Sequence, residues 1–268
     1  YELTKLYNKN YGYKSGINAS MKKHLNGITL DAQKKCNLKN QDIVLDIASN
    51  DGTLLNYYKK QKIYKIGIDP VVKKFKKNYN RNMIAYPGFF SKKNFLKLSK
   101  NKKAQILTSI AVFYDIPDPN NFVRDIKEIL SKDGIWIMEQ SYFPFLVKNN
   151  AYDSICHEHL SYFMYRQLNL ILSKHNLKVV DVKFNEMNGG SFRLFIGHSD
   201  FKRKINSKSI SQLINYEKKI FTNFSQTKKM FKKNILVSKK KLVTLLKKFK
   251  KKKIICHIYG ASTKGNVI

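Results

Sequence analysis

The densest group of chemically active side chains is the run Cys156, His157, Glu158 and His159, inside the segment Tyr152–Phe163. Two imidazoles beside a carboxylate can hold a metal ion, act as a general base with its orienting partner, or form a polar loop. A metal site needs further ligands of suitable type, and no other His or Cys pair lies nearby, so no metal is expected. A general base is the favoured interpretation, because imidazole titrates near neutral pH and an adjacent carboxylate can hold its tautomer and raise its basicity.

A second group of candidate residues lies in the segment Ile43–Leu55. Its aliphatic start predicts a buried parallel strand, which leads through the polar turn at 48–52 into a helical pattern from Thr53. The next apolar segment begins at Tyr64 and predicts a strand that ends in Asp69, about 20 residues after the turn, where an open α/β sheet binds a ribose diol. Together they predict a nucleoside site, or else an ordinary strand-helix-strand unit with a solvated aspartate.

The acidic character of the turn indicates which nucleoside derivative binds. A dinucleotide site would need Gly-x-Gly-x-x-Gly, so that backbone can approach a pyrophosphate, whereas this turn has only Gly52, with Asp46 and Asp51 beside it. Carboxylates repel phosphate and suit a cationic ligand, such as a sulfonium with an α-amino group. The stretch resembles the first motif of class I S-adenosylmethionine methyltransferases, with Asp69 in the ribose-binding role. The residues expected to contact S-adenosylmethionine are Asp46, Ala48, Asn50, Asp51, Gly52, Asp69, Ser109 and Ala111.

The elements that position these residues alternate between strands and helices, which predicts a doubly wound α/β sheet of the Rossmann-like, class I methyltransferase type. The segments 179–184 and 191–197 predict an antiparallel pair that completes the sheet edge. The loop 111–119 falls at the carboxyl edge of the sheet, where ligands bind. Further strands are predicted near 83–85, at 104–110 and at 134–138, and helices at 20–37, at 71–79 and from Asn120 or Asn121 to Asp133-Gly134.

The chain divides into four predicted regions. Residues 1–20 form an aromatic segment that is expected to pack over the rest, and residues 21–206 form the methyltransferase domain. Residues 207–252 are Lys-rich and predict an amphipathic helical connector with a solvated basic face. Residues 253–268 predict the start of a C-terminal Rossmann-like domain, with a strand at 254–259 and a Gly turn carrying Lys264 as an anion cradle. The sequence lacks an initial Met and stops inside this unit, so a fragment is expected.

The formal net charge is +34, from 52 Lys and Arg against 18 Asp and Glu. Such a charge suggests a nucleic-acid partner. However, the excess is mainly Lys spread along the chain, as an A- and T-rich genome produces, and phosphate or base readers favour Arg, so nucleic acid is not an expected partner. The three cysteines form no CxxC pair, which is typical of a reduced cytoplasm. The sequence contains no run of about 18 apolar residues, which a membrane span would need, and no membrane partner is expected.

Six motifs, in order across nearly the whole chain, resemble the sugar C-methyltransferase family that methylates C3 of nucleotide-linked 4-keto-deoxysugars. The family has an N-terminal zinc module, a central S-adenosylmethionine domain and a C-terminal Rossmann-like domain, with the sugar nucleotide between the last two. The resemblance implies that this chain covers the middle domain and both junctions, and that zinc belongs only to a module preceding it. The motifs are Tyr-Gly-Tyr-Lys-Ser-Gly at 11–16, Asp-Ile-Ala-Ser-Asn-Asp-Gly at 46–52, Glu-Gln-Ser-Tyr at 139–142, the segment 152–163, Gly-Gly-Ser-Phe-Arg at 189–193 and Tyr-Gly-Ala-Ser-Thr-Lys-Gly-Asn at 259–266.

The resemblance also implies roles for particular residues. His159 matches the general base that removes a proton next to the ketone, Glu158 matches its neighbour, and Tyr13, with Tyr11, matches an N-terminal active-site tyrosine. The enolate would then attack the sulfonium methyl in line, without a metal. The expected catalytic residues are His159, Glu158, His157, Tyr13 and Tyr114, and the expected substrate contacts are Tyr11, Cys156, Arg193, Lys264 and Asn266.

Three positions depart from the family pattern. Cys156 stands where the family has Tyr, Tyr114 where it has His, and Ala48 where it has Gly. Either Tyr114 or His157 stabilises the enolate in this chain, or the substrate differs.

The predicted function is therefore transfer of a methyl group to C3 of a nucleotide-linked 4-keto-deoxysugar. The alternatives are a class I methyltransferase acting on RNA or another small nucleophile, and an inactive basic binding module of the same fold. The sequence contains no Asn/Asp-Pro-Pro-Tyr motif for positioning an amine, whereas the His-Glu-His cluster suits the acidity of a carbon next to a ketone.

Overall fold

The computed structural model describes residues 2–8, 10–59, 62–202, 205–257 and 264–267. Over these residues the chain forms a seven-stranded sheet in the order β3-β2-β1-β4-β5-β7-β6. The first five strands are parallel, and β7 runs antiparallel to both β5 and β6. The strands are β1 (Ile43–Ile47), β2 (Tyr64–Ile68), β3 (Met83–Tyr86), β4 (Ala104–Ile110), β5 (Leu130–Ser141), β6 (Leu177–Asn185) and β7 (Ser191–His198).

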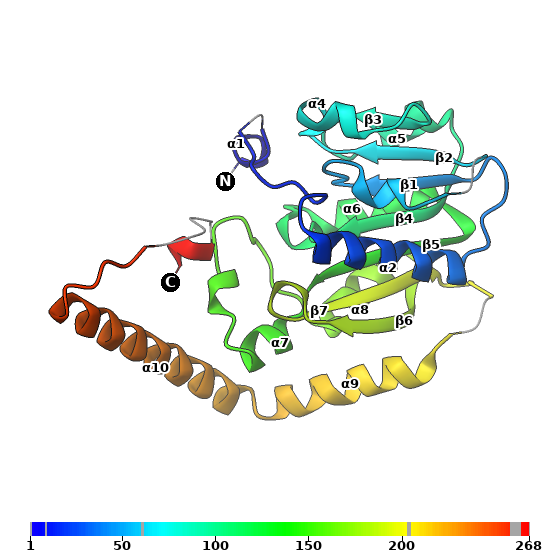
Figure 1. The fold of residues 1–268 in the computed structure, drawn as a ribbon. Coiled ribbons are helices and arrows are strands. Elements are labelled where there is room, and N and C mark those ends of the chain that lie inside the picture. Colours follow the sequence, from blue (N-terminus) through cyan, green and yellow to red (C-terminus); the bar gives the residue numbers. More distant parts are fainter. Residues whose placement is uncertain (1, 9, 60–61, 203–204, 258–263, 268) are drawn as a thin grey trace.

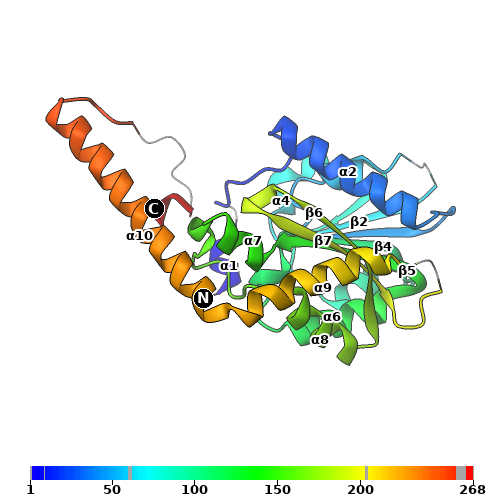
Figure 2. The ribbon, with the colours of Figure 1, turned by 90° about the horizontal axis from the view of Figure 1, so that it is seen from below.

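Helices cover both faces of this sheet, as Figure 2 shows with α2 on one side and α6, α8 and α9 on the other. None of the described helices is long and apolar enough to cross a membrane. The helices are α1 (Leu3–Leu6), α2 (Ala19–Lys35), α3 (Thr53–Asn56), α4 (Val72–Phe75), α5 (Lys92–Ser99), α6 (Pro119–Ile129), α7 (Phe143–Lys148), α8 (Tyr165–Lys174), α9 (Ser207–Thr222) and α10 (Phe224–Lys251).

The alternation of side chains along each strand divides the core into two layers. In β1, Leu45 faces the layer that contains Phe122 of α6 and Leu168 of α8, whereas Val44 faces the layer that contains Ile28 of α2. Because both faces of the central strands are buried, those strands are continuously apolar rather than alternating. The doubly wound sheet and its antiparallel edge pair are the predicted ones.

Two boundaries differ from the prediction. Helix α6 begins at Pro119 with Asp118 as its N-cap, because the Asp118 carboxylate accepts a hydrogen bond from the Asn121 backbone N–H at 3.0 Å. The helix ends at Ile129, and Asp133-Gly134, which was expected to end it, lies inside β5. That strand is longer than expected because its first residue, Leu130, already pairs with Ala104 of β4.

The helix predicted at 71–79 is also shorter than expected. It consists of α4 followed by a 3₁₀ turn at Lys76–Asn78. The Val71 N–H is bonded to the Asp69 carboxylate at 2.8 Å, so the chain leaves β2 through a side-chain-stabilised turn before the helix starts.

The predicted Lys-rich connector consists of two helices that meet at Asn223. Helix α9 packs on the sheet through the buried Leu213, while α10 contains no buried residue and projects away from the core (Figures 1 and 2). Residues 254–257, four of the six residues in the strand predicted at 254–259, have no regular structure, and 258–259 and most of the following Gly turn lie outside the described residues. Lys264–Asn266 form a 3₁₀ turn.

One buried carboxylate joins α9 to the rest of the sheet. Glu217 is 4% exposed and accepts hydrogen bonds from the Tyr142 hydroxyl (2.9 Å) and from the N–H groups of Tyr165 (2.6 Å) and Arg166 (3.0 Å). These two N–H groups are at the start of α8, where the helix itself offers them no partner. Glu217 therefore caps α8 from another helix, and its negative charge lies at the favourable end of the α8 dipole.

We expect Glu217→Ala to lower the free energy of unfolding by about 3 kcal/mol, because it leaves two buried donors, on Tyr142 and Tyr165, and the partly buried Arg166 N–H without an acceptor. Urea unfolding followed by circular dichroism measures this change. Glu186 is exposed, and Glu186→Ala should change stability by less than about 0.5 kcal/mol. Equal losses in the two variants would contradict the capping role.

Candidate active site

A cavity of about 1190 Å³ lies at the carboxyl edge of the sheet, over the ends of β1, β2, β4 and β5. The N-terminal segment, the loop after β4 and the segment around His159 form its other walls. Although the chain has a net charge of +34, acidic side chains predominate in this cavity. The acidic lining residues are Asp46, Asp69, Asp115, Asp118, Asp125, Glu139 and Glu158, and the basic ones are Lys5, His24, His159 and Lys264.

The turn after β1 is fixed by Asp69 at the end of β2. One carboxylate oxygen of Asp69 accepts from the Asn50 N–H at 2.9 Å and the other from the Val71 N–H at 2.8 Å. The side chain is 6% exposed, and burial raises the pKa of its carboxyl group. Each oxygen keeps further acceptor capacity, so Asp69 can still accept hydrogen bonds from a pair of ligand hydroxyls.

The backbone of the same turn explains the small residues in it. Ala48 has φ 57° and Asn50 has φ 51°, both in the left-handed region that favours glycine. The Ala48 N–H donates to the Ile68 carbonyl at 2.8 Å, which holds the turn against β2. Alanine in place of the family's glycine therefore preserves the turn, at a steric cost of about 1 kcal/mol.

Asp46 lies beneath this turn at the end of β1. Its carboxylate accepts from the Thr108 hydroxyl at 2.5 Å. The pKa of Asp46 is raised to about 7, mainly by burial and in smaller part by the nearby charges of Asp69 and Asp51, against the lowering effect of the Thr108 hydrogen bond. A cationic ligand would relieve this repulsion, because an opposite charge nearby favours the ionised carboxylate.

The aromatic N-terminal segment packs over the cavity, as its composition predicts. The Tyr7 hydroxyl donates to Asp115 at 2.8 Å, and the Ser15 N–H donates to the Asn50 side chain at 2.9 Å. Burial raises the pKa of Asp115 to about 7, although the hydrogen bond from Tyr7 acts to lower it. Tyr11 and Tyr13, both expected from the sequence, line the cavity from this segment.

His159 lines the cavity from the segment that follows α7. Its Nδ1 lies 2.7 Å from the Ser154 carbonyl oxygen, and its ring packs on that of Tyr114 with the centroids 4.3 Å apart. A carbonyl oxygen only accepts, so Nδ1 carries the proton and Nε2 is left as the basic nitrogen. Burial lowers the pKa of His159, against the raising effect of the Ser154 contact. The tautomer is thus held by a backbone carbonyl and not, as the sequence suggested, by a neighbouring carboxylate.

The structure brings most of the expected site residues to this cavity. Those that line it are His159, Glu158, Tyr114, Tyr13, Tyr11, Cys156, Lys264, Asp46, Ala48, Asn50, Asp69 and Ala111. His157 and Gly52 are not lining residues. Asp51 and Ser109, which were also expected to contact S-adenosylmethionine, are not lining residues either, because Asp51 accepts from the N–H groups of Gly16 and Thr53 and Ser109 accepts from the Trp136 indole N–H. The side chain of Asn266 lies outside the described structure, and the described residues contain no group of three or more metal-ligating side chains.

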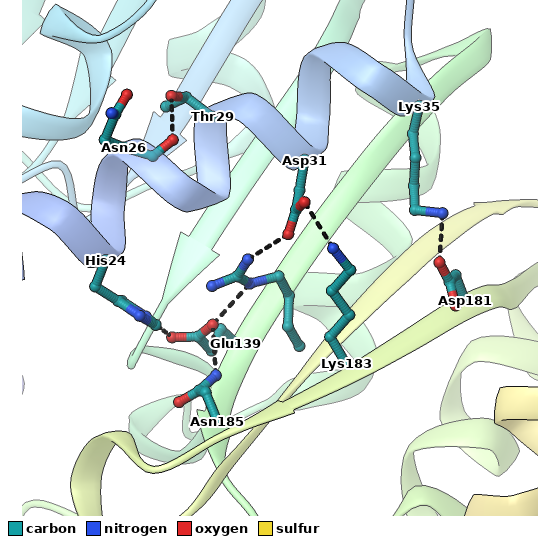
Figure 3. Close-up of polar contacts among 10 residues, drawn as sticks. His24, Asn26, Thr29, Asp31, Lys35, Glu139, Asp181, Lys183 and Asn185 are labelled. Carbon is teal, nitrogen blue, oxygen red and sulfur yellow. Dashed lines mark hydrogen bonds and ion pairs between the residues drawn. The ribbon is translucent and has the colours of Figure 1, made fainter.

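Arg193 was expected to contact substrate but lies in a buried charge network with Glu139 and Asp31, which are labelled in Figure 3. Its guanidinium donates to Glu139 at 2.8 Å and to Asp31 of α2 at 2.7 Å, and the residue is 6% exposed. Glu139 also contacts His24 Nε2 at 2.5 Å and accepts from Asn185 at 3.0 Å. Arg193 therefore joins β7 to β5 and α2 and does not line the cavity.

Sequence reasoning missed several residues of the cavity wall, namely Tyr7, His24, Asp115, Glu139 and Gln140. For Glu139 and Gln140 a signal was present, because they are the first polar residues after an apolar strand segment and so fall at the ligand-binding edge. His24 gave no local signal. Its place in the wall depends on how α2 packs across β5.

The chain matches two family models. One, described as a methyltransferase domain, matches residues 21–182, and the other, described as a C-methyltransferase C-terminal domain, matches residues 186–268. A curated relative, C-methyltransferase NovU of Streptomyces niveus, is 27% identical over 186 residues, which cover 69% of this chain and 44% of the relative. The chain thus spans less than half of that relative's length.

Solved structures show the same fold at low identity. The cyclopropane synthase MmaA2 from Mycobacterium tuberculosis has a TM-score of 0.51 and 9% identity, over 71% of this chain and 88% of that one. A LepI variant in complex with SAH and a substrate analogue has a TM-score of 0.50 and 13% identity, over 62% of this chain and 46% of that one. Because the first family model covers more than half of the sequence and these structures share its class I fold, the chain belongs to the methyltransferase domain family.

Proposed function

We propose that the protein is an S-adenosylmethionine-dependent C-methyltransferase that methylates C3 of a nucleotide-linked 4-keto-deoxysugar. The observation that carries this proposal is a neutral His159, with Nε2 as its basic nitrogen, in the same cavity as the buried carboxylate Asp69. The matches to a C-methyltransferase C-terminal domain and to NovU support carbon as the atom that is methylated.

The cavity residues fit S-adenosylmethionine. Asp69 retains acceptor capacity for both ribose hydroxyls, and the carboxylates around Asp46 suit a ligand with a positive sulfur and an ammonium group. The turn at Ala48–Gly52 lacks the glycines that a pyrophosphate would need. When bound, S-adenosylmethionine supplies an electrophilic methyl group on a positively charged sulfur.

The chain's own residues supply the base and the orientation. His159 Nε2 accepts the proton from C3, the C–H electron pair forms the C3–C4 double bond, and the carbonyl π pair moves to the ketone oxygen. The electron-rich C3 then takes the methyl group, and the C–S bond pair stays on sulfur. The Tyr114 ring and the Ser154 carbonyl hold the imidazole in place, so no reorientation is needed between binding and proton transfer.

The same acidic cavity constrains the nucleotide. A diphosphate would be repelled by the cluster of carboxylates around Asp46 and Asp69, so only the sugar enters the deep part. Lys264 lies in the cavity wall close enough to His159 to lower its pKa, and it offers a cation for the anionic part of the substrate.

Asp69→Ala should weaken S-adenosylmethionine binding at least about 10-fold, because hydrogen bonds to a charged acceptor contribute about 1.5–3 kcal/mol. Isothermal titration calorimetry measures the dissociation constant. The exposed Asp133, on the same sheet but outside the cavity, provides the matched control, and Asp133→Ala should leave the affinity unchanged. Unaltered affinity in Asp69→Ala would contradict the assigned ribose contact.

His159→Asn should abolish hydrogen–deuterium exchange at C3 when the full-length protein is incubated with S-adenosylmethionine and a 4-keto-6-deoxy nucleotide sugar in D₂O. The reason is that asparagine cannot accept the C3 proton, and proton NMR of the sugar follows the exchange. His257 is exposed, and His257→Asn serves as the matched control, in which C3 should exchange as in the wild type. If exchange were lost in His157→Asn but retained in His159→Asn, the base would be His157 and the assignment to His159 would be wrong.

The exchange rate should stay on its plateau at pH 6.5 and fall only at lower pH. Only the neutral imidazole accepts a proton, and burial lowers the pKa of His159 below the ordinary value of about 6.5. The pH profile of kcat/KM for C3 exchange reports this group in the free enzyme. An acid limb centred at or above pH 6.5 would show that His159 is not held neutral by burial.

A further inference from the structure

Two residues of the cavity wall have buried polar atoms without hydrogen-bond partners. Among the described residues that line the cavity, these atoms are both amide atoms of Gln140, Oε1 and Nε2, and one carboxylate oxygen of Asp115. Gln140 is 1% exposed, and neither atom of its amide has a partner within the described part of the protein. A buried amide in this state costs about 1–3 kcal/mol per group, and a ligand in the cavity that supplied the missing partner would recover this free energy.

Gln140 lies near the end of β5, beside the loop that follows β4. It directly follows Glu139, whose carbonyl oxygen accepts from the Ala111 N–H at 2.7 Å. The turn that starts at Ala111 continues to Tyr114, whose ring packs on His159 and whose carbonyl oxygen accepts from the Leu160 N–H at 3.0 Å. Gln140, Asp115 and His159 therefore come from three connected parts of one cavity wall: the end of β5, the loop after β4 and the segment that packs on Tyr114.

The backbone at Gln140 is held firmly. The Glu139 side chain is fixed by His24 and Asn185, as Figure 3 shows, and by Arg193, and β5 pairs with β7 at Gln140 and Phe192. Rigid support from neighbouring side chains keeps a binding group in the geometry that a transition state needs. The charge network thus holds the strand end from which the amide projects.

Carbon acid chemistry requires a donor at the ketone oxygen, because negative charge develops there as the C3 proton leaves. The sequence suggested Tyr114 or His157 for this role, but His157 is not a lining residue of the cavity. An amide N–H₂ is a neutral donor that gives up no existing hydrogen bond when it binds the oxygen. Its carbonyl oxygen can accept from a hydroxyl on the neighbouring carbon at the same time.

We propose that Gln140 is a catalytic residue that donates from Nε2 to the ketone oxygen of the acceptor and accepts at Oε1 from an adjacent hydroxyl. The substrate class that fits is an α-hydroxy ketone, and Asp115 accepts from a further hydroxyl of the same sugar. This assignment rests on the proposed C-methyltransferase function. It adds the group that stabilises the enolate oxygen and the chemical feature by which the acceptor is selected.

The test compares the full-length wild-type protein with Gln140→Met, which is close in size and has no hydrogen-bonding group of comparable strength. C3 deuterium exchange in the 4-keto-6-deoxy nucleotide sugar should fall about 100-fold, the usual effect of removing one oxyanion donor. S-adenosylmethionine affinity should stay within about 2-fold of wild type. The thermal midpoint should be equal or higher, because the change removes a buried polar group without partners.

Gln105→Met is the matched control. Gln105 lies on β4 outside the cavity and already has partners in Cys36 and Asp133, so its replacement should leave C3 exchange unchanged. Wild-type exchange that persists in Gln140→Met overturns the proposed role while leaving the C-methyltransferase function intact. A lower thermal midpoint together with weakened S-adenosylmethionine binding would assign Gln140 a structural role. Absence of exchange in the wild type with every 4-keto nucleotide sugar tried would overturn both proposals.

Discussion

The hydrogen bonds that Asp69 accepts from Asn50 and Val71 are the interaction on which the rest of the site depends. They fix the turn after β1 to the end of β2, and so define the floor of the cavity. Because the two strands are parallel and in register, their ends meet at one edge, and side chains about 20 residues apart come together without any long-range search. The other walls of the cavity are then built on this floor.

Much of this arrangement follows from local sequence patterns. Strand β4 at Ala104–Ile110 and the antiparallel pair β6 and β7 are readable because apolar runs and turn residues set them independently of the rest. The same is true of Asp69, which is identified by its place at a strand end and by its spacing from the turn.

The pairing of charges between different elements could not be predicted from the sequence. Arg193 looked like a substrate contact, yet Asp31, far away in the sequence, neutralises it through the packing of α2 on the sheet. The N-cap of α6 was misplaced by two or three residues because Asp118, Asn120 and Asn121 can all cap a helix, and the proline at 119 decided between them. The Ser154 carbonyl that orients His159 is a backbone atom, so no side-chain pattern could reveal it.

The charged side chains of this protein produce different electric fields at long range and inside the cavity. Lysines are spread over the surface and along α10, while carboxylates concentrate inside the cavity. At long range the field is positive and favours the approach of an anionic nucleotide. At short range it is negative and favours a cation, because buried charges are screened far less than exposed ones. In the function proposed above, each substrate responds to a different part of this field, and the separation explains how a strongly basic chain can hold a positively charged donor.

The N-terminal segment forms one wall of the cavity without joining the sheet. It is held over the mouth by a few side-chain contacts, among them the hydrogen bond from Tyr7 to Asp115 and the backbone contacts of Ser15 and Gly16. A small number of such bonds can break and re-form without disturbing the core. This wall of the cavity is therefore attached by contacts that are local to it, so a change in the N-terminal segment can alter the shape of the cavity while the sheet beneath it stays the same.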